Sequence, residues 1–103
     1  MNEKDLYTKA LEVWGEEAQI KMVLEELSEL SLSILHYYRG KCSLQDIASE
    51  VADVEIMVGQ LKIIFPELEG HAKCLKDYKL QRLEERFNDP EDEINDCGEP
   101  LDE

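Results

Sequence analysis

The sequence has few of the features that mark a secreted or membrane-embedded protein. Its three cysteines, Cys42, Cys74 and Cys97, are odd in number and widely spaced, so they suit neither a disulfide framework nor a CxxC metal pair. Charged residues interrupt every long apolar stretch, which argues against a bilayer-spanning helix. The first residues also lack the basic-then-apolar order of a signal peptide. We therefore expect a soluble, cytoplasmic protein without membrane association.

Basic residues are also scarce. Lys and Arg total 11 against 25 for Asp and Glu in a chain of 103 residues, which gives a formal net charge of −14. Binding to a nucleic-acid polymer relies on clustered Lys and Arg, so this balance argues against such a partner. The hydrophobic share of 43% is ordinary for a globular chain, and the length suits one small domain.

The negative charge is concentrated at the C-terminal end. Residues 88–103 contain eight acidic residues and no basic one, together with Pro90, Gly98 and Pro100. They show no apolar periodicity, which is typical of a solvated, flexible segment. We therefore divide the chain into a helical domain at residues 1–87 and a flexible acidic tail at residues 88–103.

No segment alternates with a period of two over the length of a strand, so we predict an all-α fold with four helices. The first helix is short and stops at Gly15, and the second runs from about residue 17 to residue 39. Ser43, with Asp46 three residues later, is the expected N-cap of the third helix, which ends before Pro66. The fourth extends from about residue 67 to residue 87. The second helix repeats apolar or small residues at intervals of three and four, which predicts one packed face: Ile20, Leu24, Leu27, Ser31, Ile34, Leu35 and Tyr38.

The third helix carries acids against its apolar character. Residues 47–65 read IASEVADVEIMVGQLKIIF, a pattern typical of a helix that is buried on all sides. Glu50 and Asp53 interrupt it one turn apart and on the same side. The second helix presents a matching pair, Glu26 and Glu29, also three residues apart. Two antiparallel helices joined by a short connection would place these pairs opposite each other.

Four carboxylates that face one cavity repel one another unless a cation neutralises them. Buried carboxylates are usually paired or bound to a metal, and hard oxygen ligands suit Mg²⁺ or Mn²⁺. Taken alone, the pair on the second helix is typical of a solvated surface, whereas the pair on the third lies in an apolar setting. A di-iron bundle would need Glu-x-x-His pairs, and neither His36 nor His71 has an acid three residues before it. We therefore predict a magnesium or manganese centre at Glu26, Glu29, Glu50 and Asp53.

The acidic pairs also resemble a known signature. Glu25-Glu26-Leu27-Ser28-Glu29-Leu30, followed by Glu50-Val51-Ala52-Asp53-Val54, is similar to the ExxE…ExxD signature of the MazG-like, all-α nucleoside triphosphate pyrophosphohydrolases. Trp14-Gly15 and Gln19 before the first pair, and YKLQRL at residues 78–83, also look like the compact members of that family. The resemblance covers about residues 6 to 87, with both halves of the signature in order on adjacent helices.

The resemblance implies a MazG-like four-helix bundle and a specific reaction. Members of the family use Mg²⁺ to hydrolyse (deoxy)nucleoside triphosphates to the monophosphate and pyrophosphate, which would suit house-cleaning of the nucleotide pool. At the matching positions, Glu26, Glu29, Glu50 and Asp53 would be the metal ligands. Glu26 would in addition orient or deprotonate the attacking water, with Glu25 as the alternative.

The sequence contains no glycine-rich phosphate loop, so side chains and metal must meet the charge of a triphosphate. Lys79 and Arg82 on the fourth helix are the candidate phosphate contacts; the alternative is that they are solvated basic residues that balance an acidic protein. Gln19 and Trp14 are candidates for contacts with the base, although a tryptophan is more often part of a core.

The long apolar third helix leaves more hydrophobic surface than so small a monomer covers. We therefore expect a homodimer or homotetramer with this helix at the interface, as the resemblance also implies. The competing interpretation is a non-catalytic dimerising helical adaptor or regulator whose acids only keep it in solution. That interpretation does not explain why Glu50 and Asp53 interrupt an apolar helix.

Overall fold

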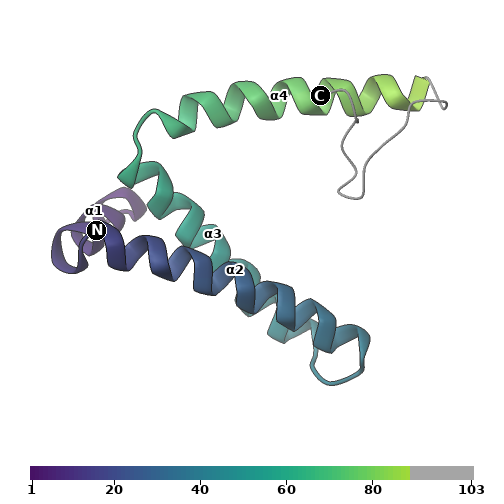
Figure 1. Cartoon of the computed structure of the whole chain (residues 1–103), viewed down its shortest axis with the longest axis horizontal. Coiled ribbons are helices and arrows are strands. Elements are labelled where there is room, and N and C mark those ends of the chain that lie inside the picture. The colour runs from purple at the N-terminus through teal and green to yellow at the C-terminus, as the bar shows by residue number, and fades with distance from the viewer. Residues whose placement is uncertain (89–103) are drawn as a thin grey trace. The chain divides into compact units, whose positions relative to one another are not determined.

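The computed structural model describes residues 1–88, and all regular structure in that range is α-helical (Figure 1). The helices are α1 (Glu3–Trp14), α2 (Glu16–Tyr38), α3 (Leu44–Ile64) and α4 (Leu68–Asn88). The predicted all-α fold and its four helices are thereby confirmed. Within the described part of the chain, no helix is both long enough and apolar enough to cross a membrane. The predicted tail lies outside the described residues, except for Asn88 at the end of α4.

The chain divides into two compact units. The first, Met1–Pro66, contains α1, α2 and α3, and the second begins at Glu67, with α4 as its described part. The apolar residues that the sequence places along α4 are exposed: Leu75, Tyr78, Leu80, Leu83 and Phe87.

Helix ends in the first unit follow local capping rules. Asn2 begins α1, because its Oδ1 accepts a hydrogen bond from the backbone N–H of Asp5 at 2.8 Å. Gly15 ends α1 with φ +87°, a backbone conformation that favours glycine, and its N–H donates to the carbonyl of Leu11 at 2.9 Å. The predicted stop at Gly15 is confirmed, and α2 begins at the next residue.

The connection between α2 and α3 is short and tightly held. Gly40 adopts φ +72° just after α2. The predicted N-cap of α3 is a complete capping box, since Asp46 N–H donates to Ser43 Oγ at 3.2 Å and Ser43 N–H donates to Asp46 Oδ2 at 2.8 Å. The backbone N–H of Ser43 and, at 3.0 Å, its hydroxyl both donate to Asp46 Oδ2, and these two hydrogen bonds lower the pKa of that carboxyl. The thiol of Cys42 donates to the carbonyl of Ser33 at 3.3 Å, which ties the connection back onto α2.

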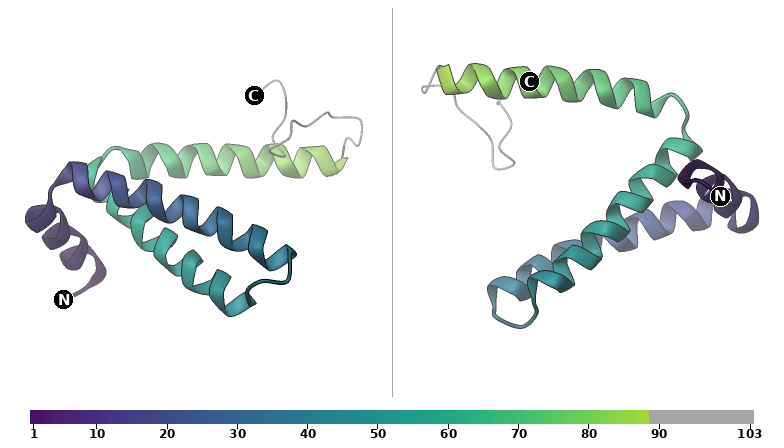
Figure 2. Two further views of the ribbon diagram at one scale, coloured as in Figure 1. Left: turned by 60° about the horizontal axis from the view of Figure 1, so that its bottom comes forward. Right: turned by 180° about the vertical axis from the view of Figure 1, so that it is seen from behind.

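Helices α2 and α3 form an antiparallel hairpin and lie side by side in every view (Figures 1 and 2). Among residues 1–88, the only buried side chains belong to these two helices: Gln19 and Val23 of α2, and Met57 and Gln60 of α3. We call the line along which α2 and α3 pack the seam. It includes the acids Glu26, Glu29 and Glu50, which come together from the two helices.

The packed face predicted for α2 is not the face that contacts α3. Leu24 is 60% exposed, Tyr38 is 83% exposed, and Leu27, Ile34 and Leu35 are exposed as well. The expectation that α3 is buried on all sides is also not met within one chain, because several of its apolar side chains are exposed: Val51, Ile56 and Val58. Apolar periodicity identifies a face that favours burial, but it does not identify the neighbour that covers that face.

Helix α1 packs on α3 through a glycine. A Cβ atom added at Gly59 would lie only 2.5 Å from Cε2 of Tyr7, so the tyrosine ring rests directly on the backbone of α3. The Tyr7 hydroxyl donates to Glu3 Oε1 at 2.9 Å, one turn earlier on α1. The missing side chain at position 59 is therefore what permits this close approach.

We expect the effect of Gly59→Ala on stability to depend on Tyr7. In a Tyr7→Ala background, the added methyl group meets open space and raises the free energy of unfolding by about 1 kcal/mol, because alanine favours the helix interior. In the wild-type background, the methyl group has to displace the Tyr7 ring, and the packing that is lost by this displacement cancels the gain. Urea unfolding of the four chains followed by circular dichroism measures the difference as a coupling energy. Equal effects of Gly59→Ala in the two backgrounds would show that the ring does not constrain the helix.

Candidate metal centre

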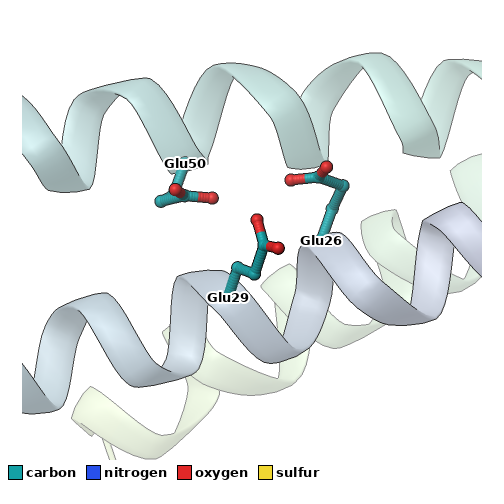
Figure 3. A group of neighbouring side chains, drawn as sticks. All are labelled: Glu26, Glu29 and Glu50. Carbon is teal, nitrogen blue, oxygen red and sulfur yellow. The ribbon is translucent and has the colours of Figure 1, made fainter.

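Three carboxylates from two helices converge at the middle of the seam. Glu26 and Glu29 stand one turn apart on α2, and Glu50 faces them from α3 (Figure 3). One oxygen atom from each of the three side chains lies within 4.8 Å of the others. The spacing of three residues puts the first two on one face of α2, and the hairpin brings the third across to them.

Two of these carboxylates are partly withdrawn from solvent. Glu26 and Glu50 are half-buried, while Glu29 is exposed. The Oε2 atoms of Glu26 and Glu50 are both shielded from solvent and have no hydrogen-bond partner. A buried polar atom without a partner destabilises the fold, and an ionised one does so more strongly. The two oxygens therefore present unsatisfied acceptors inside the group.

The electrostatics of the group follow from this arrangement. The pKa of Glu26 is raised above its ordinary value, first by desolvation and then by the negative charges of Glu29, Asp53 and Glu50. The pKa of Glu50 is raised for the same reasons, with desolvation again the largest cause, followed by the charges of Glu29 and Asp53. Protonation of either side chain relieves repulsion, and a bound cation would do the same.

The structure brings together three of the four predicted metal ligands. Asp53 is not a member of the close group, but it is half-buried on α3 and its charge raises the pKa of both Glu26 and Glu50. It therefore borders the group on the side of α3. The predicted pairing of acids across the hairpin is reproduced in the placement of Glu29 and Glu50.

The donor set fits a hard divalent cation. All three side chains offer carboxylate oxygens, and no sulfur or imidazole nitrogen belongs to the group. Mg²⁺ prefers such ligands and commonly keeps several waters, so a few carboxylates suffice to hold it. Mn²⁺ accepts the same oxygens. The unpartnered Oε2 atoms of Glu26 and Glu50 are the acceptors that such an ion would satisfy.

The residues predicted to contact substrate occupy varied settings. Trp14, at the end of α1, is 65% exposed, whereas Gln19 is only 2% exposed on α2. Lys79 and Arg82 stand three residues apart on α4, in the second unit, and both make interactions with other groups. Their contacts with phosphate stay predictions.

The sequence analysis did not single out Gln60. This side chain is 5% exposed, and its Oε1 has no hydrogen-bond partner. An available signal was its spacing, because Gln60 follows Asp53 by seven residues, just as Gln19 precedes Glu26 by seven. Apart from this spacing, nothing in the sequence indicates a functional role for Gln60, because its side chain is uncharged and lies outside the acidic signature.

Comparisons of the chain with protein-family models, with curated proteins and with solved structures return no match.

We expect Glu26→Gln and Glu50→Gln each to raise the melting temperature at pH 7 in the presence of EDTA. A folded-state pKa that is raised above the unfolded value contributes stability at low pH, and this contribution is lost as the pH rises through the folded-state pKa. A glutamine cannot ionise, so each variant avoids the stability that the wild type loses as the pH rises. The gain in melting temperature over wild type should therefore disappear as the pH falls to about 4.5, the ordinary glutamate pKa.

The matched control is Glu25→Gln, an exposed acid on the same helix, which should change the free energy of unfolding by no more than about 0.5 kcal/mol. Melting curves recorded from pH 4 to pH 8 test both expectations. Equal gains in melting temperature for Glu25→Gln, Glu26→Gln and Glu50→Gln would show that the effect comes from the lower net charge and not from the group of three carboxylates.

Proposed function

We propose that this chain is a Mg²⁺-dependent nucleoside triphosphate pyrophosphohydrolase that releases pyrophosphate and a (deoxy)nucleoside monophosphate, with a role in house-cleaning of the nucleotide pool. One observation carries the proposal: the half-buried carboxylates of Glu26 and Glu50 meet Glu29 with two shielded, unpartnered oxygens. The resemblance of residues 25–30 and 50–54 to the MazG-like signature supports the choice of reaction.

In this proposal the acids of the chain bind the ion and accept a proton. Glu26, Glu29 and Glu50 would hold Mg²⁺, with Asp53 beside them as the fourth predicted ligand. A bound ion would neutralise charge and polarise phosphate oxygens. Glu26 orients the attacking water and accepts its proton as the new phosphorus–oxygen bond forms and the α–β anhydride bond breaks.

The proposed substrate contacts are basic and aromatic side chains. Lys79 and Arg82 on α4 are the candidate phosphate contacts, and an arginine can bind two oxygens at once. The exposed indole of Trp14 offers a flat apolar surface to the base. Gln19 was predicted as a second contact with the base, and its burial means that the contact requires α1 or the substrate to open this end of the seam.

We further propose that the enzyme is a cytoplasmic homodimer or homotetramer. The exposed apolar face of α2 supports association, because its side chains form a shallow hollow with no helix of the first unit over it: Leu27, Ser28, Ser31, Leu32, Ile34, Leu35 and Tyr38. On α3, the exposed side chains of Ile56 and Val58 would be covered at the interface expected from the sequence. Exposed apolar faces of this kind favour protein–protein contact.

Release of pyrophosphate from a panel of nucleoside triphosphates with Mg²⁺ tests the reaction. We expect turnover by the wild type and a loss of at least roughly a hundredfold in Glu50→Gln and in Asp53→Asn, since metal centres lose that much even from changes around their ligands. Glu25→Gln is the matched control and should retain most of the turnover, although full loss there would transfer the role in water activation to Glu25. Circular dichroism confirms that each variant is folded. No release from any triphosphate, with Mn²⁺ tried as well, would reject the proposed reaction.

Thermal melting with and without divalent cations separates the enzyme from the non-catalytic adaptor. A cation that binds only the folded state raises stability by about 2.7 kcal/mol at a hundred times its dissociation constant. We expect Mg²⁺ and Mn²⁺ to raise the melting temperature of the wild type and to leave Glu50→Gln almost unchanged. A wild type that is indifferent to both ions would favour the adaptor.

A further inference from the structure

Half of the buried side chains in the first unit are amides. Of the four buried residues among those described, Gln19 and Gln60 are polar, with 2% and 5% of their surface exposed, and Val23 and Met57 are apolar. Gln60 Oε1 lacks a hydrogen-bond partner. A leucine or methionine would be more stable in such a position, because a buried carbonyl oxygen without a donor is unfavourable. Burial alone therefore does not account for glutamine at position 60.

The two amides lie at one level of the seam, on the side of the acids that is away from the connection. Gln19 is seven residues before Glu26 on α2, and Gln60 is seven residues after Asp53 on α3. Seven residues correspond to two turns and about 10.5 Å of α-helix. Because the helices are antiparallel (Figure 2), both amides are displaced from the acids in the same direction by the same distance. We call Gln19 and Gln60 the amide layer.

The amide layer and the connection bracket the acids. At the connection, the Cys42 thiol donates a hydrogen bond to the carbonyl of Ser33, and the Ser43 capping box fixes the start of α3. At the open end of the hairpin, Tyr7 covers Gly59, the neighbour of Gln60. The acids between them repel one another and do not hold α2 against α3. Their alignment must therefore come from the residues around them.

Apolar contacts alone define that alignment poorly. Val23 and Met57 are buried beside the amides, and apolar side chains tolerate rotation or sliding against other apolar side chains. A buried amide distinguishes between alignments of the two helices, because an alignment that surrounds its polar atoms entirely with hydrocarbon is the least favourable one. Single buried polar residues set the pairing of helices in coiled coils for this reason, at a cost in stability.

We propose that Gln60, with Gln19 at the same level, is a positioning residue that fixes how α3 is set against α2 and so keeps the acids of the candidate metal centre facing one another. This role rests on the proposed metal centre, but it concerns the alignment of the helices rather than contact with the ion. It predicts that removal of the amide raises stability while it weakens metal binding, two effects that a residue needed only for folding would not combine.

The test replaces Gln60 with methionine, which has similar length and no hydrogen-bonding amide. We expect Gln60→Met to melt at a higher temperature than wild type in EDTA, to bind Mn²⁺ roughly tenfold more weakly by electron paramagnetic resonance, and to show more than one set of backbone amide signals for α2 and α3 by NMR. Met57→Leu is the matched control, because it alters a buried apolar residue one turn away and should leave Mn²⁺ affinity and the single set of signals unchanged. Gln19→Met combined with Gln60→Met should weaken binding little more than Gln60→Met alone, since paired residues are not additive.

Each other outcome overturns the proposal in a recognisable way. Higher stability with unchanged Mn²⁺ affinity and a single set of signals would show that the amides lower stability and do not align the helices. Lower stability together with lower affinity would make Gln60 a general support of the fold. If the wild type binds no Mn²⁺, the proposed metal centre fails, and the NMR spectra alone then decide whether the amides align the helices: a single set of signals in the variant would reject that role too.

Discussion

The packing of α2 against α3 is the constraint on which the rest of the first unit depends. It brings carboxylates of like charge from two helices into one line, and two of their oxygens lose both solvent and hydrogen-bond partners. Desolvation first, and then the like charges of the neighbouring acids, raise the pKa of Glu26 and of Glu50. The hairpin holds together because its other contacts, which include the buried side chains of Val23 and Met57, outweigh the repulsion among the acids.

The distribution of apolar side chains is the second consequence of this arrangement. Helix α2 turns an acidic and amide-bearing stripe toward α3 and leaves Leu24, Leu27 and Leu35 exposed. A helix normally buries its apolar stripe first, because each square ångström removed from water contributes about 25 cal/mol. Helix α2 instead packs its polar stripe against α3 and exposes its apolar stripe. This arrangement is explained if the polar stripe forms a binding site and the apolar stripe contacts another protein chain. That reading agrees with the proposed enzyme and its proposed assembly.

Several features of the fold were predictable because their causes are local. Gly15 and the capping box of Ser43 and Asp46 are recognisable from residues that lie within one turn of one another. The meeting of Glu29 with Glu50 was predictable because spacing along each helix and a short connection leave few alternatives. The neighbour that covers the apolar face of α2 was not predictable, since periodicity identifies a face and no partner. Gln60 escaped notice because an uncharged amide becomes informative only when its burial and its missing partner are known.

In the proposed metal centre, stability and cation affinity would be opposed. Any substitution that relieves the repulsion among Glu26, Glu29 and Glu50 would stabilise the hairpin and also remove the charge that a cation needs. The contacts that stabilise the hairpin without neutralising the acids therefore lie outside the acidic group, and they include the buried side chains of Val23 and Met57. A hairpin stabilised in this way keeps its acids charged and partly dehydrated, and a partly dehydrated group of charges would attract a divalent cation more strongly than one in bulk water.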